Sequence, residues 1–259
     1  MGVVNVTPDS FSDGGLYAMT ESAICHAARL IEEGAGMLDI GGESTRPGSD
    51  SVSAAEELRR VIQVVQALAS RDIPISVDTS KPEVMLAAIQ AGAVMINDVN
   101  ALRARGALEV VAAGNVAVCL MHMQGEPHNM QTNPRYRDDV VTDVKDFLRL
   151  RLYAAQAAGI SLERLVIDPG FGFGKTLEHN LELLRHLGRF IDMGVPILAG
   201  LSRKSILGKI TGNDVGDRVH ASVAAALLAV DRGAKILRVH DVKATRDAVA
   251  VYNAVNINL

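Results

Sequence analysis

The sequence has no tryptophan, and aromatic residues make up only 3% of its 259 residues. Hydrophobic residues nevertheless account for 48% of the chain, so valine, isoleucine, leucine and alanine must fill the interior. Branched aliphatic side chains of this kind pack well in layers around parallel strands. The length is sufficient for one large hydrophobic core, and no linker, low-complexity tract or charge block divides the sequence.

Cysteine is almost as scarce, since only Cys25 and Cys119 are present. Each lies in an apolar run, so we expect two buried, reduced thiols. No apolar stretch is long enough to span a bilayer and no basic-then-apolar leader is visible, so we expect a soluble, cytoplasmic protein without a membrane partner. A net charge of −4 argues against a nucleic-acid partner, although it leaves room for a local anion-binding pocket.

Several common site motifs are also missing. Histidines are scattered singly, without an HExxH pattern or paired cysteines, which argues against a zinc site. Gly174-Lys175-Thr176 resembles the end of a nucleotide-binding P-loop, but Pro169 stands where the first glycine of that loop would lie. The glycines from Gly170 to Gly174 also lack the spacing of a dinucleotide fingerprint. We interpret them as a tight loop that lets Phe173 cover a flat ligand.

What recurs along the chain is a short branched-aliphatic run, a polar tip and a longer segment with helical spacing. Continuous hydrophobicity of this kind is typical of parallel strands covered on both faces. Eight such alternations predict a closed (β/α)8 TIM barrel that forms a single domain over residues 1–259, with an open doubly wound sheet as the alternative. The runs are Val3–Val6, Met37–Ile40, Ile73–Val77, Ala93–Ile96, Val116–Met121, Leu165–Ile167, Pro196–Leu201 and Lys235–Val239.

The intervening segments carry helix signals. Apolar residues recur on one helical face over Leu58–Leu68 and again over Val140–Leu152. Ser53 and Ser80 each stand three residues before a glutamate, which is the capping-box pattern. Pro82 would lie in the first turn of the second helix, where its missing N–H does least harm. C-terminal stop signals are expected at Gly34, Gly92, Gly159 and Gly233.

The polar tips locate the expected active site, because a barrel of this kind carries its site at the C-terminal ends of the strands. Any single tip is more often a cap or a solvated loop residue. Eight tips on one rim are harder to explain in that way. The tips are Asn5, the Gly41–Gly48 loop, Asp78, Asn97-Asp98, His122, Asp168, Ser202-Arg203-Lys204-Ser205, and Arg238 with His240.

Sorted by charge, the tips describe a ligand with two unlike halves. The acceptor set suits a flat heterocycle rich in N–H donors, such as a 2-amino-4-oxo pterin. The cationic set follows the seventh and eighth strands, where phosphates often bind in such barrels. Salt bridges between the two sets are the structural alternative. The acceptor set is Asp78, Asn97 and Asp168, and the cationic set is Lys204, Arg238 and His240.

The first two loops, Pro8–Gly15 and Gly41–Gly48, are rich in glycine, serine and aspartate and have few apolar anchors. Loops of that composition often close over a substrate, although ordinary surface loops fit it equally well.

These segments resemble a known family. Residues 5–15, Asn-Val-Thr-Pro-Asp-Ser-Phe-Ser-Asp-Gly-Gly, are similar to the first signature of the dihydropteroate synthases, and Gly41–Gly48 is similar to the second. The resemblance covers essentially the whole chain. The shorter motifs that match in order are Ser76-Val77-Asp78-Thr79, Ile96-Asn97-Asp98, Met121-His122, Asp168 through Lys175, Ser202-Arg203-Lys204-Ser205 and Arg238-Val239-His240.

The resemblance implies a reaction between 7,8-dihydropterin-6-ylmethyl diphosphate and p-aminobenzoate that yields 7,8-dihydropteroate and diphosphate, with Mg²⁺ as cofactor. It also implies a homodimer, which we expect to form through late helices such as Val219–Val230. The residues it implies are Asp78, Asn97, Met121, Asp168 and Lys204 for the pterin, Asn5, Arg238 and His240 for the diphosphate with Asn5 also binding Mg²⁺, and Phe11, Thr45, Arg46, Pro47, Phe173 and Ser202 for p-aminobenzoate, where sulfonamides compete.

Elementary chemistry agrees with these roles. Cleavage of the bond between the pterin methylene carbon and oxygen leaves positive charge on carbon and negative charge on diphosphate. Asp78 and Asp168 would stabilise the first charge, and Lys204 with the other cations and Mg²⁺ the second. An aniline nitrogen is already nucleophilic, so we expect a dissociative, SN1-like displacement with Asp78, Asp168 and Lys204 as catalytic residues.

Two other functions remain open. One is a methyltransferase of the same superfamily that moves a methyl group from methyltetrahydrofolate to a corrinoid protein, and Ser44–Pro47 and Ser202–Lys204 weigh against it. The other is a non-catalytic pterin-binding protein, which retention of both charge sets argues against. The chain begins almost on its first expected strand, whereas family members usually carry an N-terminal hairpin that closes the barrel bottom. We therefore expect that hairpin to be missing. Either the sequence has been shortened at its start, or the bottom of the barrel is more open in this protein.

Overall fold

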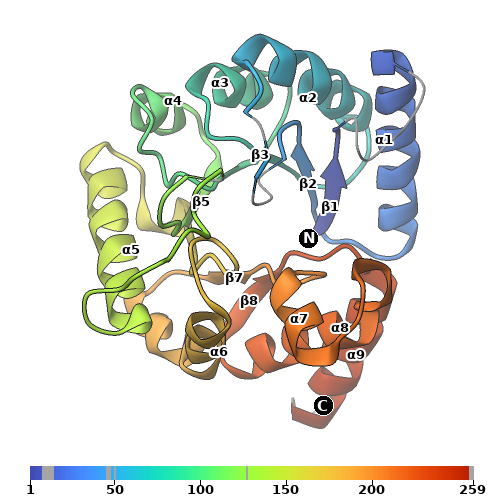
Figure 1. The fold of residues 1–259 in the computed structure, drawn as a ribbon. Helices are drawn as coiled ribbons and strands as arrows, with labels where there is room; N and C mark the ends of the chain where they lie inside the picture. The colour runs from blue at the N-terminus through green and yellow to red at the C-terminus, as the bar shows by residue number, and fades with distance from the viewer. Residues whose placement is uncertain (8–14, 45–47, 50, 127, 257–259) are drawn as a thin grey trace.

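The computed structural model describes residues 1–7, 15–44, 48–49, 51–126 and 128–256 (Figure 1). Within them, eight strands pair in parallel and in chain order. A parallel bridge between Gly2 and Val239, with Val3 N–H donating to the Val239 carbonyl at 3.0 Å, joins the last strand to the first. The closed (β/α)8 barrel is therefore confirmed. The strands are β1 (Gly2–Asn5), β2 (Leu38–Gly41), β3 (Ile75–Asp78), β4 (Met95–Asp98), β5 (Ala117–Met121), β6 (Leu165–Asp168), β7 (Ile197–Ala199) and β8 (Ala234–Leu237).

The helices form an outer ring around the strands (Figure 1). The predicted apolar face of α2 is confirmed, because Val61, Val65 and Leu68 are wholly buried, and Val144 and Leu148 are buried likewise on α5. The helices are α1 (Gly15–Glu32), α2 (Ala54–Leu68), α3 (Pro82–Gln90), α4 (Ala107–Ala113), α5 (Val140–Ala157), α6 (Leu177–Arg185), α7 (Ser205–Thr211), α8 (Val219–Asp231) and α9 (Val242–Asn256), with 3-10 turns η2 (Leu162–Arg164), η3 (Leu187–Met193) and η4 (Val215–Asp217).

The helix starts match one prediction and overturn another. Ser53 caps α2, and its Oγ accepts the Glu56 N–H at 3.2 Å. The prediction at Ser80 is wrong, because Lys81 is the residue before α3 and its side chain makes no capping hydrogen bond. Pro82 disfavours helical backbone at the residue before it, so Lys81 stays extended and the helix begins later than the pattern indicates. The predicted C-terminal signals Gly34, Gly92, Gly159 and Gly233 all have positive φ.

The two cysteines differ in burial. Cys119, on β5, is wholly buried as predicted. Cys25 is exposed, so the prediction of a buried thiol there is wrong. The reason is the helical period: Ala23, Ala27 and Leu30 form the buried face of α1, and Cys25 lies between them on the opposite face.

The barrel interior changes from apolar to polar along the strands. Successive residues of a strand point to opposite faces, so every second residue enters the barrel. On β4, β5 and β6 the inward side chains near the bottom of the barrel are the apolar Met95, Cys119 and Val166. Two residues further along the same strands, the inward side chains are Asn97, Met121 and Asp168. Polar side chains thus stand on an apolar floor at the C-terminal end. The floor consists of Met1, Met37, Met95, Ala117, Cys119, Val166, Leu198 and Ile236.

Four strands, β2, β3, β4 and β6, extend further than their apolar runs indicated, whereas β1, β7 and β8 end one or two residues earlier than theirs. Asp78, Asn97, Asp98 and Asp168 belong to the strands themselves, because main-chain pairing continues regardless of side-chain polarity. Closure of the loops Pro8–Gly15 and Gly41–Gly48 over a substrate stays a prediction, because residues 8–14 and 45–47 lie outside the described part of the chain. Among the described residues, no helix is long and apolar enough to cross a membrane.

Candidate active site

The predicted acceptor side chains come together at the polar end of the barrel. Asp78 pairs in register with Asn97, and Met121 with Asp168. All four residues are at most 8% exposed, so they lie below the rim and are shielded from solvent. Their strands place them on the inner wall, whereas the sequence analysis expected Asp78, Asn97 and Asp168 to follow the strands.

Asp39 is a further acidic residue of this wall, and sequence reasoning missed it. Its carboxylate is wholly buried and accepts hydrogen bonds from Ser76 Oγ at 2.6 Å, Asn97 Nδ2 at 3.0 Å and Arg238 Nε at 2.5 Å. Asp39 therefore connects a pterin-set residue to a cationic-set residue. The available signal was a carboxylate inside the apolar run 37–40.

Arg238 joins the two charge sets directly. Its Nη2 lies 2.8 Å from Asp78 Oδ2 while its Nε contacts Asp39. Burial opposes its charge, but Asp39 and Asp78 hold the pKa of Arg238 above its ordinary value. A salt bridge between the acceptor set and the cationic set is thus present for Asp78 and Arg238. The pockets predicted for the pterin and the diphosphate are joined by one continuous polar network.

Burial shifts the pKa values of three of these groups. It raises the pKa of Asp78 to about 7, against the opposing charge of Arg238 and with a contribution from Asp39. It also raises the pKa of Asp168, against Lys204. Burial lowers the pKa of Lys204 to about 8, against the opposing effect of Asp168. Perturbed acids and a perturbed amine in one cleft are typical of functional sites.

Lys204 lies beside Phe173 and close enough to Asp168 for each charge to affect the pKa of the other group. The Lys204 ammonium donates to the Phe171 carbonyl and lies 4.5 Å from the centroid of the Phe173 ring. Phe173 in turn packs against a small apolar cluster that includes Met121. A half-buried aromatic ring beside buried acceptors is suited to a flat ligand.

The glycine loop after β6 is tight, as predicted. Gly170 has a φ of +72°, and a Cβ there would lie 1.8 Å from the His122 carbonyl oxygen. Its N–H donates to Asp168 Oδ1 at 2.7 Å. Lys175 braces the loop, because its buried Nζ lies 2.8 Å from His122 Nδ1 and 3.0 Å from the Phe173 carbonyl. Burial lowers the pKa of Lys175 well below its usual range. Its contacts with His122 and Phe173 give this lysine a structural role in the loop.

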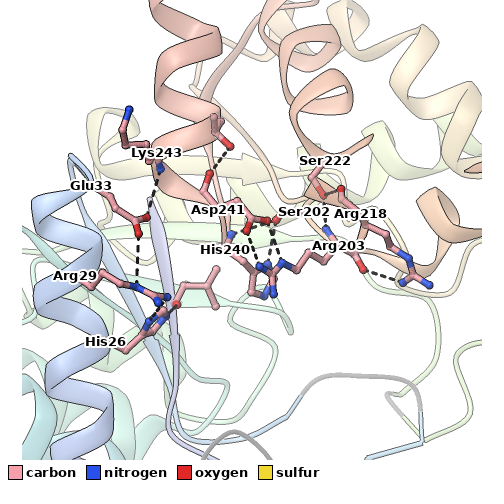
Figure 2. Close-up of polar contacts among 12 residues, drawn as sticks. His26, Arg29, Glu33, Ser202, Arg203, Arg218, Ser222, His240, Asp241 and Lys243 are labelled. Atoms are coloured by element: carbon pink, nitrogen blue, oxygen red, sulfur yellow. Dashed lines mark hydrogen bonds and ion pairs between the residues drawn. The ribbon is translucent and has the colours of Figure 1, made fainter. Parts of the chain in front are cut away.

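The remaining predicted residues line the other side of the rim. Ser202 is buried and faces His240 across the ends of β7 and β8, and its Oγ accepts the His240 N–H at 3.1 Å (Figure 2). Asn5 ends β1 and is half-buried, and its side chain makes no hydrogen bond within the described residues. Phe11, Thr45, Arg46 and Pro47 lie outside the described residues, so their roles stay predictions.

A cavity of roughly 630 Å³ opens beside Asp78, between the loops that follow β2 to β5. Lys81 lines it and forms ion pairs with Glu43 and with the wholly buried Glu57. Sequence reasoning included Glu43 in the Gly41–Gly48 loop but did not single out Lys81 or Glu57. Among the described residues, no group of three or more histidine, cysteine, aspartate or glutamate side chains could hold a metal ion.

Comparison with known proteins places this geometry in a family. The family model for pterin binding enzymes matches residues 1–240. The dihydropteroate synthase of Neisseria meningitidis serogroup C is 53% identical over 264 residues, covering 100% of this chain and 93% of the relative.

Solved structures agree with the sequence matches. Xanthomonas albilineans dihydropteroate synthase with 4-aminobenzoic acid has a TM-score of 0.94 and 56% identity, covering 100% of this chain and 93% of that one. The Yersinia pestis dihydropteroate synthase solved with a sulfonamide drug has a TM-score of 0.94 and 49% identity, covering 100% and 94%. The chain therefore belongs to the pterin-binding enzyme family, among the dihydropteroate synthases.

Proposed function

We propose that this chain condenses 7,8-dihydropterin-6-ylmethyl diphosphate with p-aminobenzoate to give 7,8-dihydropteroate and diphosphate. The most informative feature of the site is the Asp39–Arg238–Asp78 chain, in which a half-buried guanidinium joins two buried carboxylates and which puts acceptors for a heterocycle next to a cation for an anion. A pterin carrying a diphosphate has both halves. The relatives named above are called dihydropteroate synthases, which is the name of this reaction's enzyme. One of them was solved with 4-aminobenzoic acid, the amine substrate.

The pterin ring would lie against the acceptor wall. Carboxylates of Asp78 and Asp168 accept N–H groups, and the Asn97 amide can donate and accept. Met121 and Phe173 would pack on the ring faces, with Lys204 donating to a ring acceptor. Each of these residues is buried or half-buried, so the ring would exchange water for fixed partners.

The diphosphate would lie toward the ends of β7, β8 and β1. Arg238 and His240 supply N–H donors there, and Asn5 supplies a carboxamide that has no hydrogen bond among the described residues. Mg²⁺ is commonly held by one or two protein oxygens together with substrate phosphates. The Asn5 carboxamide fits that role. When bound, Mg²⁺ would neutralise charge that develops on the leaving diphosphate.

Catalysis in this site would be electrostatic. As the bond between the methylene carbon and oxygen breaks, the ionised Asp78 and Asp168 stabilise the cationic carbon. Arg238 and His240 stabilise the departing diphosphate by hydrogen bonds, and Lys204, which donates to the ring, adds positive charge nearby. The p-aminobenzoate nitrogen then forms the new carbon–nitrogen bond and releases its proton to solvent. We propose that Ser202 and Phe173, with Phe11, Thr45, Arg46 and Pro47, surround the amine, and that sulfonamides bind in its place.

We also propose that the enzyme works as a homodimer in the cytoplasm. The late helices and the turn between them carry exposed apolar side chains, namely Ile210, Val215, Leu228, Val251 and Val255. Pairing of these helices between two copies would remove such side chains from water, which supports a dimer formed there. Both cysteines are free thiols, which a reducing compartment preserves. Light scattering after size exclusion would give twice the chain mass for the dimer and the chain mass if the proposal is wrong.

Turnover tests the proposed reaction. Purified protein is mixed with the pterin diphosphate, p-aminobenzoate and Mg²⁺, and dihydropteroate is followed by chromatography, with and without EDTA and a sulfonamide. We expect product that EDTA abolishes and that the sulfonamide reduces in competition with p-aminobenzoate. A folded protein that binds the pterin diphosphate but makes no product would contradict the proposal. Such a result would favour the non-catalytic binding protein, or the methyltransferase if methyltetrahydrofolate binds instead.

A further inference from the structure

Arg203 is held in an unusual backbone conformation between two residues of the proposed site. It lies between Ser202 and Lys204, and its φ is +58°. The left-handed region is unfavourable for a residue with a Cβ, and such conformations persist only where surrounding contacts enforce them. The turn directs Ser202 toward His240 and Lys204 toward the Phe173 ring.

The start of α8 holds the backbone of Arg203. The Arg203 N–H donates to Ser222 Oγ at 2.9 Å, and the Arg203 carbonyl accepts from Arg218 Nη1 at 3.1 Å. Ser222 Oγ in turn donates to the Arg218 carbonyl at 2.7 Å. Both polar groups of the Arg203 main chain are thus satisfied by side chains from another helix (Figure 2).

The Arg203 side chain reaches across to the segment that follows β8. Its Nε lies 3.0 Å from Asp241 Oδ2 and its Nη2 2.5 Å from Asp241 Oδ1, which is a two-pronged ion pair. Asp241 is itself anchored, because its carbonyl accepts from Thr245 N at 3.1 Å and Thr245 Oγ1 at 2.9 Å in the first turn of α9. The guanidinium therefore binds the carboxylate of a residue whose main chain is anchored at the start of α9.

Two adjacent cross-links consequently connect the same two loops. Ser202 contacts His240, and one residue further along both loops Arg203 contacts Asp241 (Figure 2). We propose that Arg203 and Asp241 are positioning residues, whose ion pair fixes Lys204 and His240 relative to each other and so sets the spacing between the pterin and diphosphate positions. This inference rests on the proposed function.

A purely structural role makes a different prediction. The Arg203 side chain is 37% exposed, and ion pairs at that exposure contribute little to unfolding stability. Misplacing a group that holds a reacting substrate, by contrast, lowers the rate by up to about a hundredfold. The two roles therefore separate when catalysis and stability are measured on the same variants.

The test compares Asp241→Asn and Arg203→Lys with a matched control. Asp247→Asn breaks an exposed lysine–aspartate pair on the same helix, where Lys243 Nζ lies 2.6 Å from Asp247 Oδ2. We expect Asp241→Asn to lower kcat/KM for the pterin diphosphate roughly 10- to 100-fold. KM for p-aminobenzoate should stay within twofold of wild type. Arg203→Lys keeps the charge without the two-pronged geometry, so it should give an intermediate loss. The control should match wild type.

Calorimetric binding of inorganic diphosphate supplies a readout besides turnover, and we expect weaker binding in both variants but not in the control. Wild-type kinetics in both variants would overturn the inference. So would equal increases in both KM values, or losses that follow a fall in the thermal midpoint. If Asp241→Asn fails to fold, Ser222→Ala loosens the same turn from the α8 side and should show the same selective loss. An inactive wild-type protein would instead refute the proposed function, so the two failures are distinguishable.

Discussion

Replacing Asp39 with asparagine removes a buried carboxylate that links the two halves of the proposed site. Asparagine keeps the shape of the side chain but loses the charge and points an NH₂ group at donors. The Asp39 carboxylate accepts from Ser76, Asn97 and Arg238 in the wild-type protein, so at least one of these donors would lose its partner.

The magnitude follows from burial and charge. Removing one member of a buried ion pair costs about 3–5 kcal/mol. Asp78 continues to neutralise Arg238, so we take the lower end and expect a loss of about 3 kcal/mol in the free energy of unfolding. Misoriented Arg238 and Asn97 should also weaken transition-state stabilisation by roughly 2 kcal/mol. That energy corresponds to a fall of roughly 30-fold in kcat/KM for the pterin diphosphate.

Urea unfolding followed by circular dichroism, together with initial rates of dihydropteroate formation, measures both quantities. Glu182→Gln is the control, because the ion pairs of Glu182 with Arg185 and His186 are exposed and their loss should change stability by less than about 0.5 kcal/mol. A stability change below about 1 kcal/mol for Asp39→Asn, with kcat/KM within twofold of wild type, would refute the reasoning.

Three further predictions follow from the same structure. Because Asp78, with a pKa of about 7, must be ionised and Lys204, with a pKa of about 8, must be protonated, kcat/KM should rise with pH through about 7 and fall above about 8; a flat profile from pH 6 to 9 would contradict this. Gly170→Ala should destabilise the fold by more than about 3 kcal/mol, since its Cβ would lie 1.8 Å from a carbonyl oxygen. Gly159→Ala, with a φ of +91° and open space, should lose only about 1 kcal/mol in urea unfolding. Iodoacetamide should label the folded chain once, at the exposed Cys25, because the other thiol is wholly buried and burial raises its pKa; mass spectrometry of a doubly labelled native protein would show otherwise.

The barrel could be predicted from the sequence because buried parallel strands read as continuous apolar runs. For β3 and β6 the same criterion placed the strand end too early, since Asp78 and Asp168 pair in the sheet despite their charge. The predicted pterin and diphosphate residues lie on one rim because strand ends are local features that the barrel gathers. Their assignment to ligand atoms remains a prediction.

What the sequence could not provide depends on contacts between distant segments. Asp39 interrupts an apolar run, and only the structure reveals that its partners are Ser76, Asn97 and Arg238. The left-handed backbone of Arg203 likewise depends on α8 and on the segment after β8, which no local pattern encodes.

The central claim is that the buried charges separate the carbon–oxygen bond before the amine attacks. Placing ¹⁸O at the bridging position between the pterin methylene carbon and phosphorus tests it most directly. With enzyme and Mg²⁺ but without p-aminobenzoate, reversible dissociation should move the label into non-bridging phosphate positions, detectable by ³¹P NMR of recovered substrate. Label that stays at the bridging position, in a preparation that forms dihydropteroate once p-aminobenzoate is added, would contradict the account.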